Sequence, residues 1–278
     1  MGSTTAVFFP FDLFGSGGTA NGARLLADAF AEMLADNRRE KEPTRALAYQ
    51  PHVKSRELAF DKIGDYHDWR QRGRQAAKQV WDKNHLLLWV TGNHLGALPV
   101  YDELSRWPAA QTTVVQFDAH LDIYHLSDCT SELSHGNWLR HVAPPLPRII
   151  NLGHRELLLR PDYVAQYFDR AFAAPDLALD LEPALKHIRQ ACRSAKQVVI
   201  DIDCDCLDPA FFPAVANPLP FGLSPQQLLR CLEAAWSPKA VAVTLSEFDP
   251  SRDRNDQSLA TLVWLMEHLL LRRHESDA

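Results

Sequence analysis

The chain has 278 residues, 46% hydrophobic and 23% charged, enough for one large α/β domain or two small ones with a sizeable core. Its 29 basic and 35 acidic residues give a net charge of −6, so nothing in the charge favours nucleic acid or an anionic membrane as a partner. No apolar run reaches the ~18 residues that span a bilayer, and the start lacks the basic segment of a signal peptide. The cysteines, an odd and sparse set of 5, favour reduced thiols, and we expect a cytoplasmic enzyme.

Short apolar runs alternate along the chain with helical patterns. Runs bounded by turn residues, without strict alternation, predict strands covered on both faces at 6–9, 86–90, 112–117, 148–152, 197–200 and 240–245. Apolar residues at helical spacing predict helices over 22–35, 225–235 and 258–271, the second opened by Ser224, Pro225 and the capping-box residue Gln227. This alternation predicts one α/β/α domain over 1–278, with three layers and a central parallel sheet.

Metal-ligand side chains follow three of the predicted strands directly. His94 follows the strand at 86–90, the segment 118–122 (Asp-Ala-His-Leu-Asp) follows 112–117, and Asp201 and Asp203 follow 197–200. Asp118, His120 and Asp122 share one parity, as do Asp201 and Asp203, so an extended backbone aims each set one way. Because ligands bind beyond the carboxyl ends of parallel strands, we expect these side chains to converge on one crevice.

Two histidines and four carboxylates form an oxygen-rich set that suits Mn²⁺. Carboxylates packed this closely would repel one another without cations, and two divalent ions would cancel their charge. A zinc site at Cys204 and Cys206 is disfavoured, because these cysteines alternate with aspartates and no second ligand pair accompanies them. Each motif alone is better explained as a solvated carboxylate or a structural histidine, but their joint occurrence favours a dinuclear centre.

Three segments closely resemble the signatures of the ureohydrolases, the family of arginase, agmatinase and their relatives. They are 118–122, 201–209 (Asp-Ile-Asp-Cys-Asp-Cys-Leu-Asp-Pro) and 246–250 (Ser-Glu-Phe-Asp-Pro), and 134–136 is similar to an agmatinase-type Ser-His-Gly. The resemblance implies a fold of the arginase–deacetylase type and two Mn²⁺ ions. It implies His94, Asp118, Asp122 and Asp201 as ligands of the first ion and His120, Asp118, Asp201 and Asp203 as ligands of the second, with Asp118 and Asp201 bridging.

The resemblance also implies a reaction. Metal-activated water attacks the carbon of a guanidinium group, and the products are urea and an amine. By this resemblance Asp122 orients the nucleophile, His135 carries protons, including one to the departing amine, and Glu247 holds the guanidinium by charge-assisted hydrogen bonding. Ureohydrolases commonly form trimers or hexamers, so a homo-oligomer is compatible with the resemblance.

The chain departs from the family at the other end of the substrate. Arginases place an asparagine two residues after the aspartate that corresponds to Asp122, where this chain has Tyr124, and the family's Gly-Thr-Gly-Thr-Pro is replaced by the segment 214–218. We therefore expect an arginine-like substrate without recognition of a free α-carboxylate. Peptide-embedded arginine converted to ornithine is slightly favoured over agmatine or another small guanidino compound, with Tyr124, Asn137 and Trp138 at the mouth of the site.

Other classes remain open at this point. A deacetylase-like amidohydrolase would use a single zinc ion, which the second set of ligands argues against. A non-catalytic metal-binding relative is favoured only by Asn93, which stands where the family has an aspartate but can still accept a hydrogen bond from an imidazole. The glycines of 15–20 fit a dinucleotide-binding fingerprint, but a further loop separates them from the preceding strand.

Overall fold

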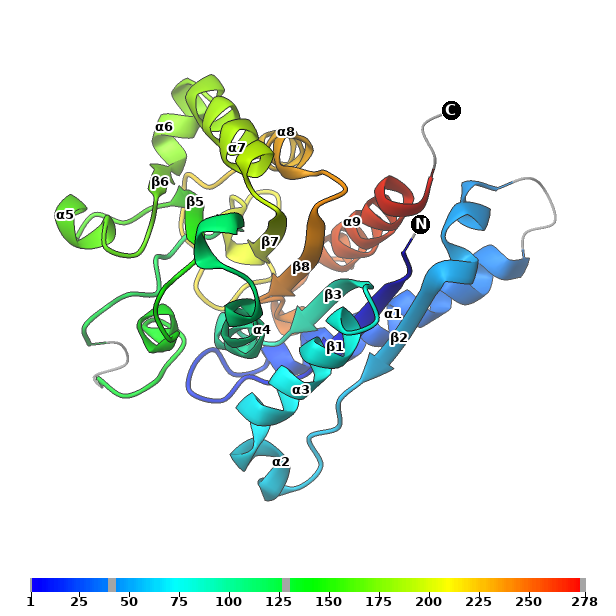
Figure 1. Ribbon diagram of the computed structural model, residues 1–278. Coiled ribbons are helices and arrows are strands. Elements are labelled where there is room, and N and C mark those ends of the chain that lie inside the picture. The colour runs from blue at the N-terminus through cyan, green and yellow to red at the C-terminus, as the bar shows by residue number, and fades with distance from the viewer. Residues whose placement is uncertain (1, 40–43, 127–130, 276–278) are drawn as a thin grey trace.

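A single sheet of parallel strands forms the centre of the protein (Figure 1). The structure is a computed structural model, and it describes residues 2–39, 44–126 and 131–275. The 8 strands run in the order β2-β1-β3-β8-β7-β4-β5-β6. Their bounds are β1 Thr4–Phe9, β2 Val53–Glu57, β3 Leu86–Thr91, β4 Thr112–Phe117, β5 Arg148–His154, β6 Arg170–Ala173, β7 Gln197–Asp203 and β8 Ala240–Ser246. The predicted three-layer fold with a parallel sheet is confirmed.

Helices cover both faces of this sheet. One face packs against α1 (Thr19–Arg39), α6 (Ala174–Leu179), α7 (Glu182–Ser194), α8 (Pro225–Ala235) and α9 (Gln257–His274). The other face packs against α2 (Ile63–His67), α3 (Trp69–Trp81), α4 (Leu98–Glu103) and α5 (Pro161–Val164). Alternate residues of β1 divide between the two cores, with Phe8 in the first and Phe9 in the second, as expected for a strand buried on both sides.

Short 3₁₀ helices shape the connections. They are η1 (Arg45–Ala48), η2 (Gln50–His52), η3 (His94–Ala97), η4 (Leu104–Arg106), η5 (Ala109–Gln111), η6 (Trp138–His141), η7 (Cys204–Cys206) and η8 (Pro250–Arg252). Two of them carry residues of the candidate site, η3, which is separated from the end of β3 by two residues, and η7, which directly follows β7.

The structure differs from the sequence-based elements mainly at strand ends. The helix over 225–235 has the predicted bounds, and Ser224 and Gln227 form the predicted capping box. The edge strands β2 and β6 were not predicted, because the polar sequence of β2 and the four residues of β6 lack a long apolar run. The strand predicted at 197–200 continues to Asp203, which places Asp201 inside the sheet.

Two other expectations concern membrane-spanning segments and the state of the cysteines. Within the described part of the chain, no helix has both the length and the apolarity to cross a membrane. Cys192, Cys204, Cys206 and Cys231 are buried free thiols, whereas Cys129 lies outside the described residues.

The four strands that end at the candidate site, β3, β8, β7 and β4, are consecutive neighbours in the middle of the sheet. Their carboxyl ends meet at one edge, so the residues that follow them come together. Two of these residues have left-handed backbones, Asp122 with φ 50° and Glu247 with φ 65°. Non-glycine residues rarely adopt this conformation, and such strained residues concentrate at functional sites.

Candidate active site

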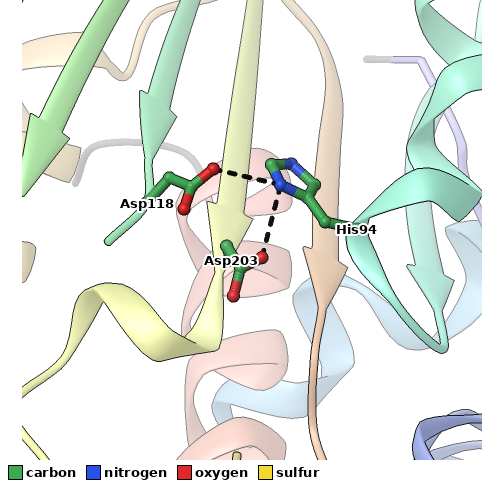
Figure 2. A group of neighbouring side chains, drawn as sticks. All are labelled: His94, Asp118 and Asp203. Carbon is green, nitrogen blue, oxygen red and sulfur yellow. Dashed lines mark ion pairs between the residues drawn. The ribbon is translucent and has the colours of Figure 1, made fainter. Parts of the chain in front are cut away.

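The imidazole of His94 lies among three carboxylates from two other strand ends. Its Nδ1 atom is 3.1 Å from Asp118 Oδ2, 3.1 Å from Asp122 Oδ2 and 3.3 Å from Asp203 Oδ2. Figure 2 shows Asp118 at the end of β4 and Asp203 at the end of β7, both turned toward the His94 ring. Neighbouring ligands in an octahedral shell with bonds of ~2.1 Å are separated by about 3 Å, so this spacing fits a divalent cation.

A second group of ligand atoms shares Asp118 with the first. His120 Nδ1 lies 2.9 Å from Asp205 Oδ2 and 3.9 Å from Asp118 Oδ1. Oδ2 of Asp118 faces His94, and Oδ1 lies on the side of His120. Asp118 therefore belongs to two ligand groups, one with His94 and Asp203 and the other with His120 and Asp205. A carboxylate placed between two ligand groups in this way can bridge two metal ions.

The structure places the aspartates at the end of β7 differently from the sequence-based ligand scheme. Asp201, expected to bridge the ions, lies behind His94, with its Oδ2 3.0 Å from Nε2, the nitrogen that faces away from the ligand group. Asp203 occupies the shared position beside Asp118 and His94 instead, and Asp205 faces His120. The reason is local. Since β7 runs on to Asp203, the chain leaves the sheet three residues later than expected, and η7 then turns Asp205 into the site.

The candidate ligand groups carry excess negative charge, as a cation site should. Asp118, Asp203 and Glu247 are buried. Burial raises the pKa of Asp118 to about 7, with a contribution from Asp122, and the pKa of Glu247 to about 7, with a contribution from Asp205. Burial also holds the pKa of Asp203 well above its usual range. In addition, Asp118 Oδ2 has no hydrogen-bond partner in the described residues, and a bound cation would satisfy it.

The pair of His120 and Asp205 behaves as an ion pair. Burial lowers the pKa of His120, but the charge and hydrogen bond of Asp205 outweigh burial and raise this pKa to about 10. Burial raises the pKa of Asp205, but His120 lowers it to about 2. A metal ion between these side chains would take the place of the proton on His120, so its binding must release protons.

His135 lies at the wall of the cavity, against the loop that follows β1. Its backbone N–H donates to Phe14 O at 2.9 Å, and its Nδ1 is 3.5 Å from Ser16 Oγ. Asn217 Nδ2 in turn donates to Ser16 Oγ at 3.1 Å. The glycine-rich loop therefore supports His135, and α1 begins only at Thr19, so the dinucleotide-binding alternative is not supported.

Glu247 and His135 line a cavity above the ligand groups. The cavity has a volume of about 490 Å³, and its wall includes His94, His120, Asp122, Tyr124 and residues 216–219. The backbone N–H of His94 donates to Glu247 Oε1 at 2.9 Å, which fixes this carboxylate beside the ligands. A carboxylate held at the floor of a cavity is placed to receive a cationic group.

Of the predicted mouth residues, Tyr124 lines the cavity, with its hydroxyl hydrogen-bonded to Glu156, whereas Trp138 and Asn137 do not. Trp138 is fully buried, and its Nε1–H donates to Asp122 Oδ2 at 2.7 Å. The amide of Asn137 is used within its own loop, where it accepts from Ser134 N and donates to Glu132 O. Trp138 therefore positions Asp122, and Asn137 stabilises its own loop.

Two further polar residues beside the site differ from expectation or were not singled out. Asn93 does not contact the imidazole of His94 as expected. Its Nδ2 donates to Leu13 O at 3.0 Å, and its Oδ1 has no partner in the described residues. Arg155 was not predicted to matter, yet its Nη2 donates to Asp205 O at 2.6 Å and to Leu219 O at 3.2 Å. Arg155 thus joins a candidate ligand to the loop that lines the cavity.

Comparison with known proteins shows the family of the chain. The model of the Arginase family matches residues 4–271, nearly the whole chain. The chain belongs to the arginase family. It is therefore a hydrolase of the ureohydrolase type, which acts on guanidino groups.

Relatives in this family carry two different activities in their names. An agmatinase of Neisseria meningitidis (serogroup B) is 26% identical over 223 residues, 80% of this chain and 70% of the relative. Arginase 1, mitochondrial, of Arabidopsis thaliana is 32% identical over 194 residues, 66% of this chain and 53% of the relative.

Solved structures of the family share the fold. Arginase from Bacillus cereus superimposes with a TM-score of 0.78 at 16% identity and covers 100% of both chains. Proclavaminate amidino hydrolase from Streptomyces clavuligerus gives a TM-score of 0.77 at 18% identity, covering 99% of this chain and 92% of the other. At these identities the likeness concerns the fold alone, so the choice of substrate must come from the site itself.

Proposed function

We propose that this protein binds two Mn²⁺ ions and hydrolyses the terminal guanidinium of an arginine-like side chain to urea and an amine. The observation that carries the proposal is the position of Asp118, whose two oxygens face separate ligand groups. In this proposal His94, Asp118, Asp122 and Asp203 hold the first ion, and His120, Asp118, Asp203 and Asp205 hold the second. The oxygen-rich donor set with only two imidazoles favours Mn²⁺ over ions that prefer sulfur.

The ions would supply one chemical function, a lowered pKa of water, so that a nucleophile is available at neutral pH. The chain's own residues do the rest. Glu247, fixed by the N–H of His94, receives the guanidinium and orients its carbon toward the ligand groups. Asp122, held by Trp138, accepts a hydrogen bond from the attacking water and aligns it.

Proton balance requires a donor for the leaving group. Attack of water on the guanidinium carbon forms a C–O bond, and loss of the amine breaks the C–N bond to the substituted nitrogen. That nitrogen leaves only after it takes up a proton, which His135 donates from the cavity wall. The water gives up two protons, one that restores His135 and one that ends on the departing nitrogen, so one water and one guanidinium cation give urea and one protonated amine.

We further propose a peptide as the substrate, with its arginine side chain reaching the cavity. Large apolar side chains are exposed on three loops near the mouth. Phe14, whose carbonyl binds His135, is 56% exposed, and Leu158, whose N–H binds Glu156, is 80% exposed. Phe221 is 75% exposed and lies two residues beyond the cavity loop at 216–219. Such residues suit the neighbouring side chains of a peptide better than the bare amine of a small substrate.

A small guanidino amine is the second candidate. The agmatinase relatives that span 80% of this chain favour it. Among the described residues that line the cavity there is also no lysine or arginine to bind an α-carboxylate. One assay separates the candidates. Urea release is measured with Mn²⁺-loaded protein on an arginine-containing peptide capped at both ends, on agmatine and on free arginine. The peptide should be hydrolysed with the highest kcat/KM, and no urea from any of the three would refute the proposal.

Two wider expectations belong with the proposal. The family match over residues 4–271 supports one domain over 1–278, and the sparse, odd set of 5 cysteines supports a cytoplasmic location. We also propose a homo-oligomer, as is common among ureohydrolases, to be checked by sedimentation of the Mn²⁺-loaded protein.

A further inference from the structure

A row of buried polar residues crosses the sheet directly beneath the ligand groups. In the strand register Asp201 of β7 pairs with Thr244 of β8 on one side and with Gln116 of β4 on the other, and Gln116 pairs with Asn151 of β5. All four side chains are completely buried. Buried polar groups are costly unless they are hydrogen-bonded, so an uninterrupted row across four strands calls for an explanation.

The row is organised around the carboxylate of Asp201. The hydroxyl of Thr244 donates to Oδ1. The hydroxyl of Tyr101, from α4, donates to Oδ2 at 2.6 Å, and Gln116 Nε2 lies 3.5 Å from the same oxygen. Asn151 Nδ2 donates to Gln116 Oε1 at 3.1 Å, which sets the orientation of the Gln116 amide toward Asp201. The donors come from every side, so the structure accommodates a carboxylate at this position rather than a neutral group.

The carboxylate of Asp201 contacts His94, a candidate ligand of the first metal ion. His94 Nε2 is 3.0 Å from Asp201 Oδ2, while Nδ1 on the opposite side of the ring faces the oxygens of Asp118, Asp122 and Asp203. A histidine that donates one N–H to a carboxylate has the lone pair of its other nitrogen directed to the metal, and it becomes a stronger ligand. The Trp138 ring packs edge-on against His94, with the two ring centroids 5.0 Å apart, and Tyr101 packs in turn against Trp138.

We infer that Asp201 is a positioning residue for the first metal ion. It fixes the proton of His94 on Nε2, presents Nδ1 to the ion, and adds a negative charge behind the ring. Asn93, next to His94 in sequence, does not contribute this charge, because its side chain is neutral and is bonded to Leu13 O. The inference rests on the metal sites of the proposed function, but it concerns binding and not turnover.

The test compares two variants that each remove one polar function from the row. Asp201→Asn keeps the shape and an acceptor for Nε2–H but removes the charge. Tyr101→Phe is the matched control, which removes a hydroxyl from the same oxygen and leaves the charge in place. Mn²⁺ binding is measured by calorimetry on metal-free protein, with circular dichroism and thermal unfolding as checks on folding.

Asp201→Asn should weaken the tighter of the two binding events about 10- to 100-fold, the usual loss when the carboxylate partner of a ligating histidine is changed. Tyr101→Phe should stay within about threefold of the wild type on the same reasoning, because the charge is retained. Equal loss in both variants, or full affinity in Asp201→Asn, would overturn the inference. Absence of Mn²⁺ binding by the wild type would instead refute the proposed function.

A measurement on the unaltered protein covers the case in which Asp201→Asn does not fold. With ¹⁵N-labelled histidine and Zn²⁺, a diamagnetic ion, NMR reports which nitrogen of His94 carries the proton. The inference expects the proton on Nε2 and the metal on Nδ1. A metal on Nε2 would overturn it.

Discussion

Gly15 offers a way to move His135 without changing any group that reacts. A Cβ atom added at Gly15 would lie 2.5 Å from His135 Cγ, 2.6 Å from His135 Cβ and 2.9 Å from Asn93 Nδ2. The crowded atoms of His135 are close to its backbone, so a change of rotamer at the ring end does not relieve the overlap. Since carbon atoms pack at about 3.5 Å, His135 or the loop that carries it must move by roughly 1 Å.

A displacement of this size has a predictable cost. A misplacement of 1 Å in a reacting geometry lowers rate by about 100-fold, equivalent to about 2.7 kcal/mol of transition-state free energy. Gly15→Ala should therefore reduce kcat for urea release by about two orders of magnitude if His135 donates the proton. Mn²⁺ content should stay at the wild-type value, because none of the close contacts is to a proposed ligand.

The same loop supplies the control. No atom lies within 4 Å of a Cβ added at Gly17, so Gly17→Ala should keep wild-type kcat. Both variants are assayed for urea release, metal content and thermal unfolding. Full activity in Gly15→Ala would refute the role of His135. Loss of activity in both variants would show instead that the loop as a whole, and not the position of His135, is responsible.

Three further predictions concern the ligand groups and the cavity floor. Asp205→Ala should leave at most one Mn²⁺ per chain by elemental analysis, because His120 loses its partner at 2.9 Å, and retention of two ions would contradict the ligand scheme. Glu247→Gln should raise KM for the guanidino substrate about 10- to 100-fold, the value of a charge-assisted hydrogen bond, while Mn²⁺ content is unchanged; an unaltered KM would argue against guanidinium binding at this residue. The pKa values of Asp118 and Glu247, raised by burial to about 7, mean that the metal-free protein loses stability as pH rises from about 4 through 7. Bound Mn²⁺ requires the ionised carboxylates, so the difference in Tm between loaded and metal-free protein should widen from pH 5 to 8, and a constant difference would show that these groups do not titrate with the metal.

The sequence predicted the central part of the fold well, because the buried strands carry continuous apolar runs. The strand at 112–117 and the helix at 225–235 have the predicted bounds. The edge strand β2 escaped detection because solvent reaches one side of it, and its sequence Val-Lys-Ser-Arg-Glu carries one apolar residue. Edge strands are defined by their neighbour, and a local pattern does not contain that information.

The choice of ligand residues at the site was likewise not contained in the local sequence pattern. Asp201, Asp203 and Asp205 alternate along the chain, so all of them share one parity, and a shift of two residues leaves the side-chain pattern unchanged. Only the point where β7 ends decides which pair reaches the site, and this point is set by pairing with β4 and β8. The residue types and the shared Asp118 were accessible from the sequence, but the choice among equivalent aspartates required the sheet.

Arg155 has a consequence for attempts to retarget this enzyme. Its guanidinium ties the carbonyl of Leu219, in the loop that lines the cavity, to the carbonyl of Asp205, whose side chain belongs to the second proposed ligand group. Exchanging the rim for that of a relative would therefore disturb metal retention as well as selectivity, unless the anchoring carbonyl is preserved. Libraries that randomise positions 216–218 and leave Leu219 in place should yield more variants that still hold manganese than whole-loop transplants do.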